Sequence, residues 1–552
     1  MRIRLTRRSA LLSACAVCST LGVTSRPAWA FEYQFDNGVE INFDNTVQYS
    51  VIERTAPESS YLGGLMNAND GDNNFSGGIV SNRGDLLTKF DINYQGYGFD
   101  TTVDSFYDLA YNQNTKQAAG NPTYNAESEP SNKFPSATVA QAGRNIELRN
   151  LFVYGSHTFG NVPVTLRVGR LVNIFGESLF FANNGIAYGT APVDVERAVS
   201  VPNTQAKDLF LPVGQALLSV QPTPSITVDA YYMFEWEKFN FQPVGSYFSP
   251  TDILVEGAQR LMYFPPEGYA PGGYLYRAPD QGAANTGQFG IALHYDPPNG
   301  NYDIGLYALQ YNDTAPQIYV RNALYPTLVA PHALSFGTFQ LVYPEHIQIY
   351  GLSGSTTYGP TNFAGEVSVR TNEPLESSVE LGPEQAANNS DNPAYAVGNT
   401  LHYQASAVYL GPGTWLWQGS SWLTEIAADS LLGITKNRSA YAYSLANGTT
   451  TTPNHMALGF RTQFTADYFH VLPNLDITVP IGLGYNFMGY APDSAAFNNT
   501  GIDRGGDLTA GVSFSYLNIW TGGISYTRYI APPGRDNFAD RDFVQFNVER
   551  TF

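Results

Sequence analysis

Three residues near the N-terminal end, Asn69, Asp70 and Asp72, have the types and spacing that could bind a calcium ion. They flank Gly71 in a run of Asn and Asp, and carboxylate and amide oxygens are the ligands that calcium prefers. The run lacks the bidentate Glu and the full spacing of an EF-hand loop. A polar turn therefore stays open as the alternative, and we expect no other cofactor.

The histidines and serines form no pattern typical of catalysis. The 7 histidines show no metal-ligand spacing, and the run Gly-Leu-Ser-Gly-Ser at 351–355 lacks the last Gly of a Gly-x-Ser-x-Gly elbow. A lipase would need a Ser and a His on neighbouring strands, and the sequence leaves that arrangement open. We expect a protein that is not an enzyme.

Residues 173–212, which we call the 173–212 segment, combine aromatic and charged side chains. Such a segment is too apolar to lie in water over its whole length and too charged to face lipid. Its aromatic residues could line the path of a hydrophobic ligand, while its charged residues pair with surrounding groups. The residues that we expect to line this path or to form these pairs are Phe175, Phe180, Phe181, Arg170, Glu177, Asp194, Glu196, Arg197, Lys207 and Asp208.

Residues 1–30 have the pattern of a secretory signal peptide. Arginines precede an apolar stretch at 9–23, and Ala28-Trp29-Ala30 is a cleavage site of small residues. We expect cleavage after Ala30. Two other interpretations stay open: a twin-arginine export signal at Arg7-Arg8 and a lipoprotein signal that ends at Cys15.

The composition of the remaining chain narrows the class of protein. Both cysteines lie in the signal, so disulfides and thiolate chemistry are excluded. Removing the 5 signal arginines from 29 basic residues leaves 24 against 48 acidic ones, a net charge of −24. Nucleic acid is excluded as a partner, because phosphate binding needs clusters of Lys and Arg.

Apolar residues alternate with polar ones along most of the chain, which predicts β-strands. From Phe31 to Val51 the apolar residues lie on odd positions, which predicts one long strand. Strand pairs joined by short Gly, Pro or Asn turns follow along the chain. We predict about 18 strands (16–18), with hairpins at 95–98, 160–161, 222–224, 296–300, 359–360, 411–413, 473–474 and 518.

The connections alternate between these short turns and long loops such as 238–286, 313–344 and 371–398. Short turns at one end and long loops at the other are typical of an outer-membrane barrel. We therefore predict an all-β protein, a transmembrane antiparallel barrel over 31–552 with short periplasmic turns and long extracellular loops. We expect the barrel to lie in the outer membrane of a Gram-negative bacterium, surrounded by outer-membrane lipid. A secreted sandwich or propeller is the alternative.

The C-terminal residues resemble the signal read by the barrel assembly machinery. Phe546, Val548 and the terminal Phe552 lie on one face of the last strand, which Arg550 interrupts. A barrel of this size encloses a channel unless something fills it. We therefore expect the 173–212 segment to fold into the lumen as a hatch, and a structured extracellular loop is the alternative.

Several ordered motifs resemble the outer-membrane family catalogued as domain of unknown function 1302. They lie at 67–75, 81–83, 169–178, 191–195, 234–237, 343–351, 365–368 and 539–543. The resemblance implies a barrel similar in kind to the long-chain fatty-acid transporter. It also implies a periplasmic partner protein, an inner-membrane transporter and movement of hydrophobic compounds.

The predicted function is passage of hydrophobic small molecules or lipids, of fatty-acid, steroid or aromatic type, across the outer membrane. The internal hatch would gate this passage. The main alternative is a general diffusion porin with an open aqueous lumen, which would place Arg opposite Asp and Glu at its constriction. An outer-membrane lipase is the minor alternative.

Overall fold

The computed structural model describes residues 31–552, apart from 118–119, 122–123, 203, 205–208, 265–271, 299, 331–332, 445–449, 494–502 and 532–533. The predicted signal peptide and its cleavage site lie outside the described residues. Within the described residues, no helix is long and apolar enough to cross a membrane.

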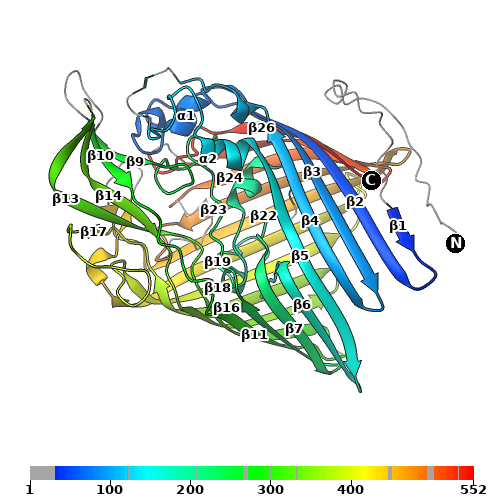
Figure 1. Cartoon of the computed structure of the whole chain (residues 1–552). Helices are drawn as coiled ribbons and strands as arrows, with labels where there is room; N and C mark the ends of the chain where they lie inside the picture. The colour runs from blue at the N-terminus through cyan, green and yellow to red at the C-terminus, as the bar shows by residue number, and fades with distance from the viewer. Residues whose placement is uncertain are drawn as a thin grey trace.

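Eighteen antiparallel strands form a closed barrel, because the last strand, β26, pairs with β2 from Thr46↔Thr551 to Arg54↔Phe543 (Figure 1). Their order around the barrel is their order along the chain. The strands are β2(Val39–Arg54), β3(Gly78–Tyr94), β4(Tyr97–Asp108), β5(Arg144–Phe159), β6(Val162–Leu171), β7(Val213–Thr223), β8(Ile226–Met233), β11(Gln288–Tyr295), β12(Tyr302–Tyr311), β15(Ile347–Tyr358), β16(Thr361–Pro374), β18(Val397–Gly411), β19(Gly419–Lys436), β22(Met456–Leu472), β23(Leu475–Met488), β24(Gly506–Tyr516), β25(Trp520–Tyr529) and β26(Phe543–Thr551).

The predicted hairpins join the strands as expected, except that the β18–β19 connection spans 412–418 rather than 411–413, and residue 299 of the 296–300 turn lies outside the described residues. The β3–β4 turn places Gln95 and Gly96 at φ 52° and 87°, the left-handed conformation of a two-residue hairpin loop that matches strand twist. The β22–β23 turn likewise places Asn474 at φ 62°.

The single long strand predicted from Phe31 is wrong. The chain forms a short strand β1(Phe31–Gln34), turns, and pairs antiparallel with β2 at Tyr33↔Ile41. Gly38 has φ 86° in that turn, and the preceding Asp36-Asn37 favours a turn as well. Apolar and polar residues keep alternating through the turn, so the periodicity of the sequence does not reveal where the first strand ends.

Three predicted loops contain a second sheet of five strands. It consists of β9(Arg260–Phe264), β10(Gly272–Arg277), β13(Gln317–Ala330), β14(Ala333–Val342) and β17(Glu380–Leu381). β10 and β14 pair in parallel although they come from different connections. The sheet projects from the barrel at the left of Figure 1.

The connections also contain short helices and a small strand pair. These elements are η2(Leu62–Gly64), α1(Asp70–Asn74), η3(Ala110–Asn112), α2(Ser136–Thr138), η4(Val139–Gly143), η5(Ile186–Gly189), α3(Val195–Ser200), η7(Arg438–Ala440), β20(Tyr443–Ser444) and β21(Thr450–Thr451).

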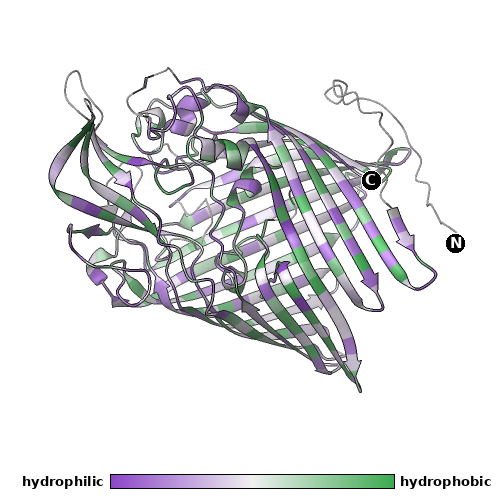
Figure 2. Cartoon of the chain, viewed as in Figure 1, coloured by the Kyte–Doolittle hydropathy of each residue, from purple (hydrophilic) through white to green (hydrophobic). Residues whose placement is uncertain are grey.

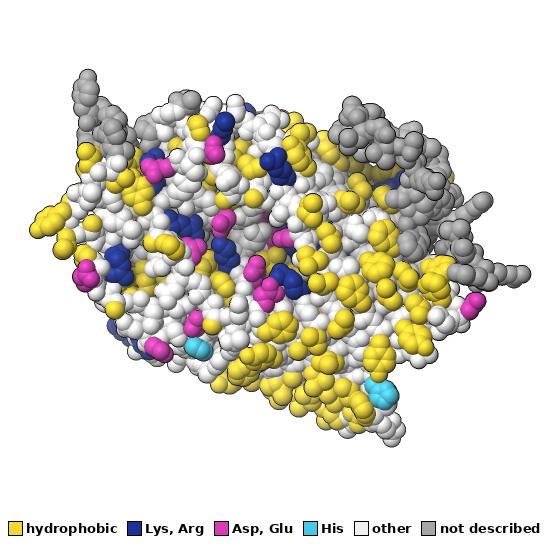
Figure 3. Space-filling view, in the orientation of Figure 1, with side chains coloured by type: hydrophobic (Ala, Val, Ile, Leu, Met, Phe, Trp, Pro, Cys, Tyr) yellow, Lys and Arg dark blue, Asp and Glu magenta, His cyan; other side chains and the backbone are white. Residues whose placement is uncertain are grey.

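The barrel has an apolar outer face and a polar inner face. On β16, the exposed Val367 lies between the buried Glu366 and Ser368, and on β19 the exposed Ile426 follows the buried Glu425. The strands alternate between hydrophobic and hydrophilic residues in Figure 2, and Figure 3 shows hydrophobic side chains gathered over the strands at lower right. Because lipid offers no hydrogen-bond partners, a closed barrel with this exterior is a transmembrane barrel of the outer membrane.

Candidate functional site

The 173–212 segment leaves the wall after β6 and rejoins it at β7, and in between it contacts strands from the other half of the chain. Glu366 points inward from β16 and accepts the backbone N–H groups of Glu177 at 2.7 Å and Ile186 at 2.9 Å. Gln404 on β18 donates to the same carboxylate at 3.0 Å. One buried carboxylate therefore binds two points of the segment that lie nine residues apart.

A second inward carboxylate, Glu425 on β19, binds the residues between those two points. It accepts the backbone N–H groups of Leu179 at 3.0 Å, of Phe181 at 2.9 Å, and of Phe180. Together the two glutamates hold the first part of the segment against β16 and β19, and we call this pair the glutamate seat.

Two glycines allow this close approach. A Cβ atom added at Gly176 or at Gly185 would lie 2.3 Å from a carboxylate oxygen of Glu366. Gly176 also has φ +94°, a conformation that side chains rarely adopt. Only glycine at these two positions lets the backbone reach the carboxylate.

Arg370, which is fully buried on β16, strengthens the same attachment. Its Nη2 donates to the carbonyls of Asn183 at 2.7 Å and Gly185 at 3.1 Å. Its Nη1 pairs with Glu373 at 3.3 Å and Asp493 at 3.1 Å. The guanidinium thus connects the segment with two buried carboxylates of the barrel's extracellular end.

Glu373, His402 and Asp493 bring ligand-type atoms within 4.8 Å of one another, the one such group among the described residues. Both ring nitrogens of His402 already have partners, Asn184 Oδ1 at 3.0 Å and Thr400 Oγ1 at 2.8 Å. Arg370 also bonds both carboxylates, and a cation there would face its charge. The contacts fit a hydrogen-bonded cluster better than a metal centre.

The apolar residues of the segment pack against the wall. Phe175 and Ile186 are 5% and 0% exposed, and Phe175 contacts the rings of Tyr231 and Tyr307 at 5.5 and 5.8 Å. Phe181, with the half-buried Phe180, packs on Ala427, Ala457 and Ala491. These contacts anchor the segment to the wall, and a role of its apolar side in lining a ligand path stays a prediction.

The later part of the segment attaches through α3 to β4 and β5, on the near wall. Asp194 caps this helix by accepting the N–H of Arg197 at 3.1 Å and pairs with Arg149 on β5 at 3.2 Å. Arg197 pairs with Asp104 on β4. Glu196 is buried beside them, and burial raises its pKa to about 8.

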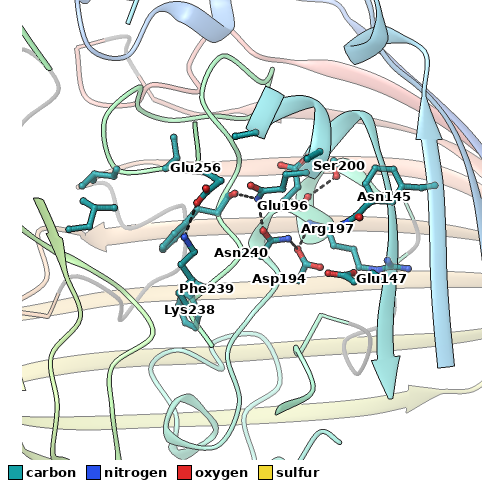
Figure 4. A pocket seen from close by; sticks show the side chains of 18 of the residues that line it. Asn145, Glu147, Asp194, Glu196, Arg197, Ser200, Lys238, Phe239, Asn240 and Glu256 are labelled. Carbon is teal, nitrogen blue, oxygen red and sulfur yellow. Dashed lines mark hydrogen bonds and ion pairs between the residues drawn. The ribbon is translucent and has the colours of Figure 1, made fainter. Parts of the chain in front are cut away.

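Two cavities adjoin these ion pairs, each of about 380 Å³. The first, shown in Figure 4, has Glu147, Asp194, Glu196 and Arg197 on one side and Lys238 with Glu256 on the other. The second lies along the inner faces of β3 to β6. Arg197 lines both cavities, so its side chain lies between them.

Of the remaining predicted residues, Arg170 lies apart from the glutamate seat, whereas the backbone N–H of Glu177 is bound by it. Arg170 pairs with Glu235 and donates to the carbonyl of Pro212 at 3.0 Å, at the rim of the wall. Burial raises the pKa of Glu177 above its usual value. Lys207 and Asp208 lie outside the described residues.

The predicted calcium ligands lie at the start of α1. Asn69 precedes the helix and donates to the carbonyl of Gly63 at 2.9 Å, and Asp70 is the first helical residue. Asp72 pairs with Arg54 at 3.1 Å and with Arg541 at 3.3 Å, so each of its oxygens faces a guanidinium. Calcium at this run stays a prediction, and a cation there would compete with two arginines.

Two residues of the predicted assembly signal, Phe546 and Val548, lie on β26, and Phe552 directly follows the strand. Phe546 is 42% exposed on the outer face, where it pairs with Val51 and Ile524, and Val548 follows two residues later. The guanidinium of Arg550 lies 5.1 Å from the ring centre of Trp520. The arginine that interrupts the apolar face therefore has an aromatic partner.

Sequence reasoning missed Glu366, Glu425, Arg370 and Arg149. Each is a charged residue at an inward position of a long strand, and that placement is the available signal. The sequence does not show that residues about 180 positions away supply the partners of Glu366.

Comparison with solved structures finds matches of low sequence identity. OccK2 (OpdF) of Pseudomonas aeruginosa in complex with glucuronate is 9% identical, with 93% of this chain and 98% of that chain covered and a TM-score of 0.40. OccAB1 of Acinetobacter baumannii is 10% identical, with 93% and 96% covered and a TM-score of 0.44. A BenF-like porin from Pseudomonas fluorescens Pf-5 is 10% identical, with 93% and 98% covered and a TM-score of 0.42.

Comparison with curated proteins finds no match. A family model matches residues 11–552, which is nearly the whole chain and agrees with the resemblance of its motifs. The chain therefore belongs to the family described as "Protein of unknown function (DUF1302)".

Proposed function

We propose that this barrel passes hydrophobic small molecules or lipids across the outer membrane, through a lumen that the 173–212 segment closes as a hatch. The glutamate seat is the observation that carries the proposal. It binds the backbone of the segment from the far wall, with Glu366 and Glu425 together accepting five N–H groups.

This attachment is strong and still reversible. Each hydrogen bond contributes roughly 0.5–1.5 kcal/mol net, and none is covalent. The Arg197–Asp104 and Arg149–Asp194 pairs attach the later part of the segment to the near wall in the same manner. A hatch held by such contacts can open when a ligand binds more tightly to the open state than to the closed state.

The proposal involves no covalent step. Selectivity would come from apolar surfaces and a few polar groups in the lumen. Consistent with the family resemblance, a periplasmic partner protein and an inner-membrane transporter would act on the same compounds after they leave the barrel.

A general diffusion porin is the second candidate, and one observation favours it. Arg83, Arg149 and Arg197 lie near Asp104 and Asp194 on the inner wall, which is the mixture of charges that a polar constriction requires. A porin would carry a steady ion current, whereas a hatched barrel would not.

Single-channel conductance of the refolded chain 31–552 in a planar lipid bilayer tests the proposal. We expect a closed or rarely open trace for the natural protein, frequent openings for Glu366→Gln/Glu425→Gln and a large steady current after deletion of 176–208. Glu53→Gln, at an exposed glutamate, is the control and should stay closed. A large steady current in the natural protein, unchanged by the deletion, would establish the porin.

A further inference from the structure

The second lumen cavity, of about 380 Å³, has an unusual charge. Four basic side chains line it: Lys89 on β3, Arg149 on β5, Arg167 on β6 and Arg197 on the 173–212 segment. Among the described residues that line it, none is Asp or Glu. This is notable in a chain whose acidic residues outnumber its basic ones, 48 to 29.

Two of these four charges have no ion pair. Arg149 pairs with Glu147 and Asp194, and Arg197 pairs with Asp104. Lys89 and Arg167 form no ion pair with any residue in the described part of the chain. No carboxylate of the described residues lies within ion-pair distance of either side chain, and Asp100 acts on Lys89 only at longer range, so both can bind an anion in the cavity.

The rest of the lining is largely apolar. It includes Leu87, Phe152, Leu171, Ile174 and Phe210. Ile174 is 42% exposed, unlike the packed Phe175 that follows it. A volume of this size is within the range of small-ligand pockets, whose apolar walls give affinity and whose few polar groups fix orientation.

We propose that this cavity is a binding site for an amphipathic carboxylate, an aromatic or alicyclic acid. Its carboxylate would bind Lys89 and Arg167, and its ring body would lie on the apolar side chains. Arginine matches a carboxylate in two-point geometry, and lysine adds a point charge. The inference rests on the proposed function and gives its hydrophobic cargo an anionic group.

The charges on either side of the cavity fit such a ligand. Arg197 lies between this cavity and the one in Figure 4, so an incoming carboxylate competes with Asp104 for the guanidinium. Nearer to the short β3–β4 turn, Asp91 and Asp100 face each other across the two strands. This acidic pair repels a carboxylate and confines it to the basic cavity.

Calorimetric titration of the refolded chain 31–552 in lipid nanodiscs tests the site. The probes are biphenyl-4-carboxylate and its neutral relative biphenyl-4-carboxamide, which share the ring body. We expect the carboxylate to bind about ten-fold tighter than the amide or better, and its affinity to fall with added salt. Lys89→Gln/Arg167→Gln should remove that preference and leave amide binding unchanged.

The matched control is Lys133→Gln/Arg144→Gln, which removes the same two charges at exposed positions of the long-loop end. It should keep the preference. Equal binding of the two probes by the natural protein, absence of binding, or an unchanged preference in the cavity variant would overturn the site.

Flux of the same probes into proteoliposomes separates this inference from the proposed function. Selective binding without flux would contradict the proposed passage and support the binding site. Flux that the cavity variant does not alter would support the passage and contradict the binding site.

Discussion

Arg541 and Asp72 are 469 positions apart in the sequence, yet their side chains pair at 3.3 Å and both are wholly buried. Asp72 also holds Arg54, so one carboxylate compensates two guanidinium groups beneath the long loops. The contact joins α1 to the connection before β26 and to the end of β2, close to where the barrel closes.

Replacing Asp72 with Asn should destabilise the barrel. The substitution leaves two buried arginines with less compensation, a change that typically costs about 3–5 kcal/mol. The free energy of unfolding in guanidinium, followed by tryptophan fluorescence, measures the loss. Glu256→Gln is the control, because its pair with Lys238 is exposed and contributes under about 1 kcal/mol. Equal losses in the two variants would contradict this assignment.

Gly185→Ala should release the first part of the 173–212 segment. The added Cβ would lie 2.3 Å from Glu366, and overpacking of this kind costs about 1–3 kcal/mol. Open probability in a planar bilayer should rise about ten-fold, since 1.4 kcal/mol is a factor of ten. Gly433→Ala on β19, where a Cβ meets nothing within 4 Å, should leave the trace unchanged. No change in the Gly185 variant would argue against the glutamate seat as the closure.

Glu196 should make stability depend on pH. Burial raises its pKa to about 8 in the folded protein, whereas the unfolded value is 4.5. Between these values the folded state binds more protons than the unfolded state, so stability falls as pH rises, by up to about 1.4 kcal/mol per pH unit. Below the unfolded pKa the carboxyl is protonated in both states and contributes no slope.

Glu196→Gln should flatten that slope and raise stability at pH 8 and above. Denaturant midpoints from pH 5 to 9 give the measurement. If the plots of midpoint against pH run parallel for the variant and the natural protein, Glu196 is not the titrating group.

Calcium should give no heat when titrated into the refolded chain. Asp72 is occupied by two arginines, and Asp70 accepts the N–H of Asn125 at 3.0 Å. A saturable heat, lost in Asp70→Asn, would contradict this expectation and restore the calcium site predicted from the run of Asn and Asp.

The barrel could be predicted from the sequence because each strand has a local signal in its alternating residues and its flanking turn. Outward residues such as Val367 and Ile426 must be apolar, and turn residues such as Gln95-Gly96 mark where the direction reverses. The parallel pairing of β10 with β14 has no such local signal, because its partners lie in different connections.

The site was predicted only in part for the same reason. The mixture of charge and aromatic residues identified the 173–212 segment, and Asp194 and Arg197 do form ion pairs there. Glu366 and Glu425 look like ordinary inward residues of a strand. Their importance arises from long-range contacts with the backbone near Gly176 and Gly185. Residue types and periodicity do not encode such contacts.

The glutamate seat also constrains the biogenesis of the protein. The residues that it holds, 177–186, can dock only where β16 and β19 supply the two carboxylates. A partly assembled barrel that lacks either strand therefore has an incomplete seat for them. The segment can then close the pore only after both strands have joined the wall, so an intermediate stalled before that step would leak.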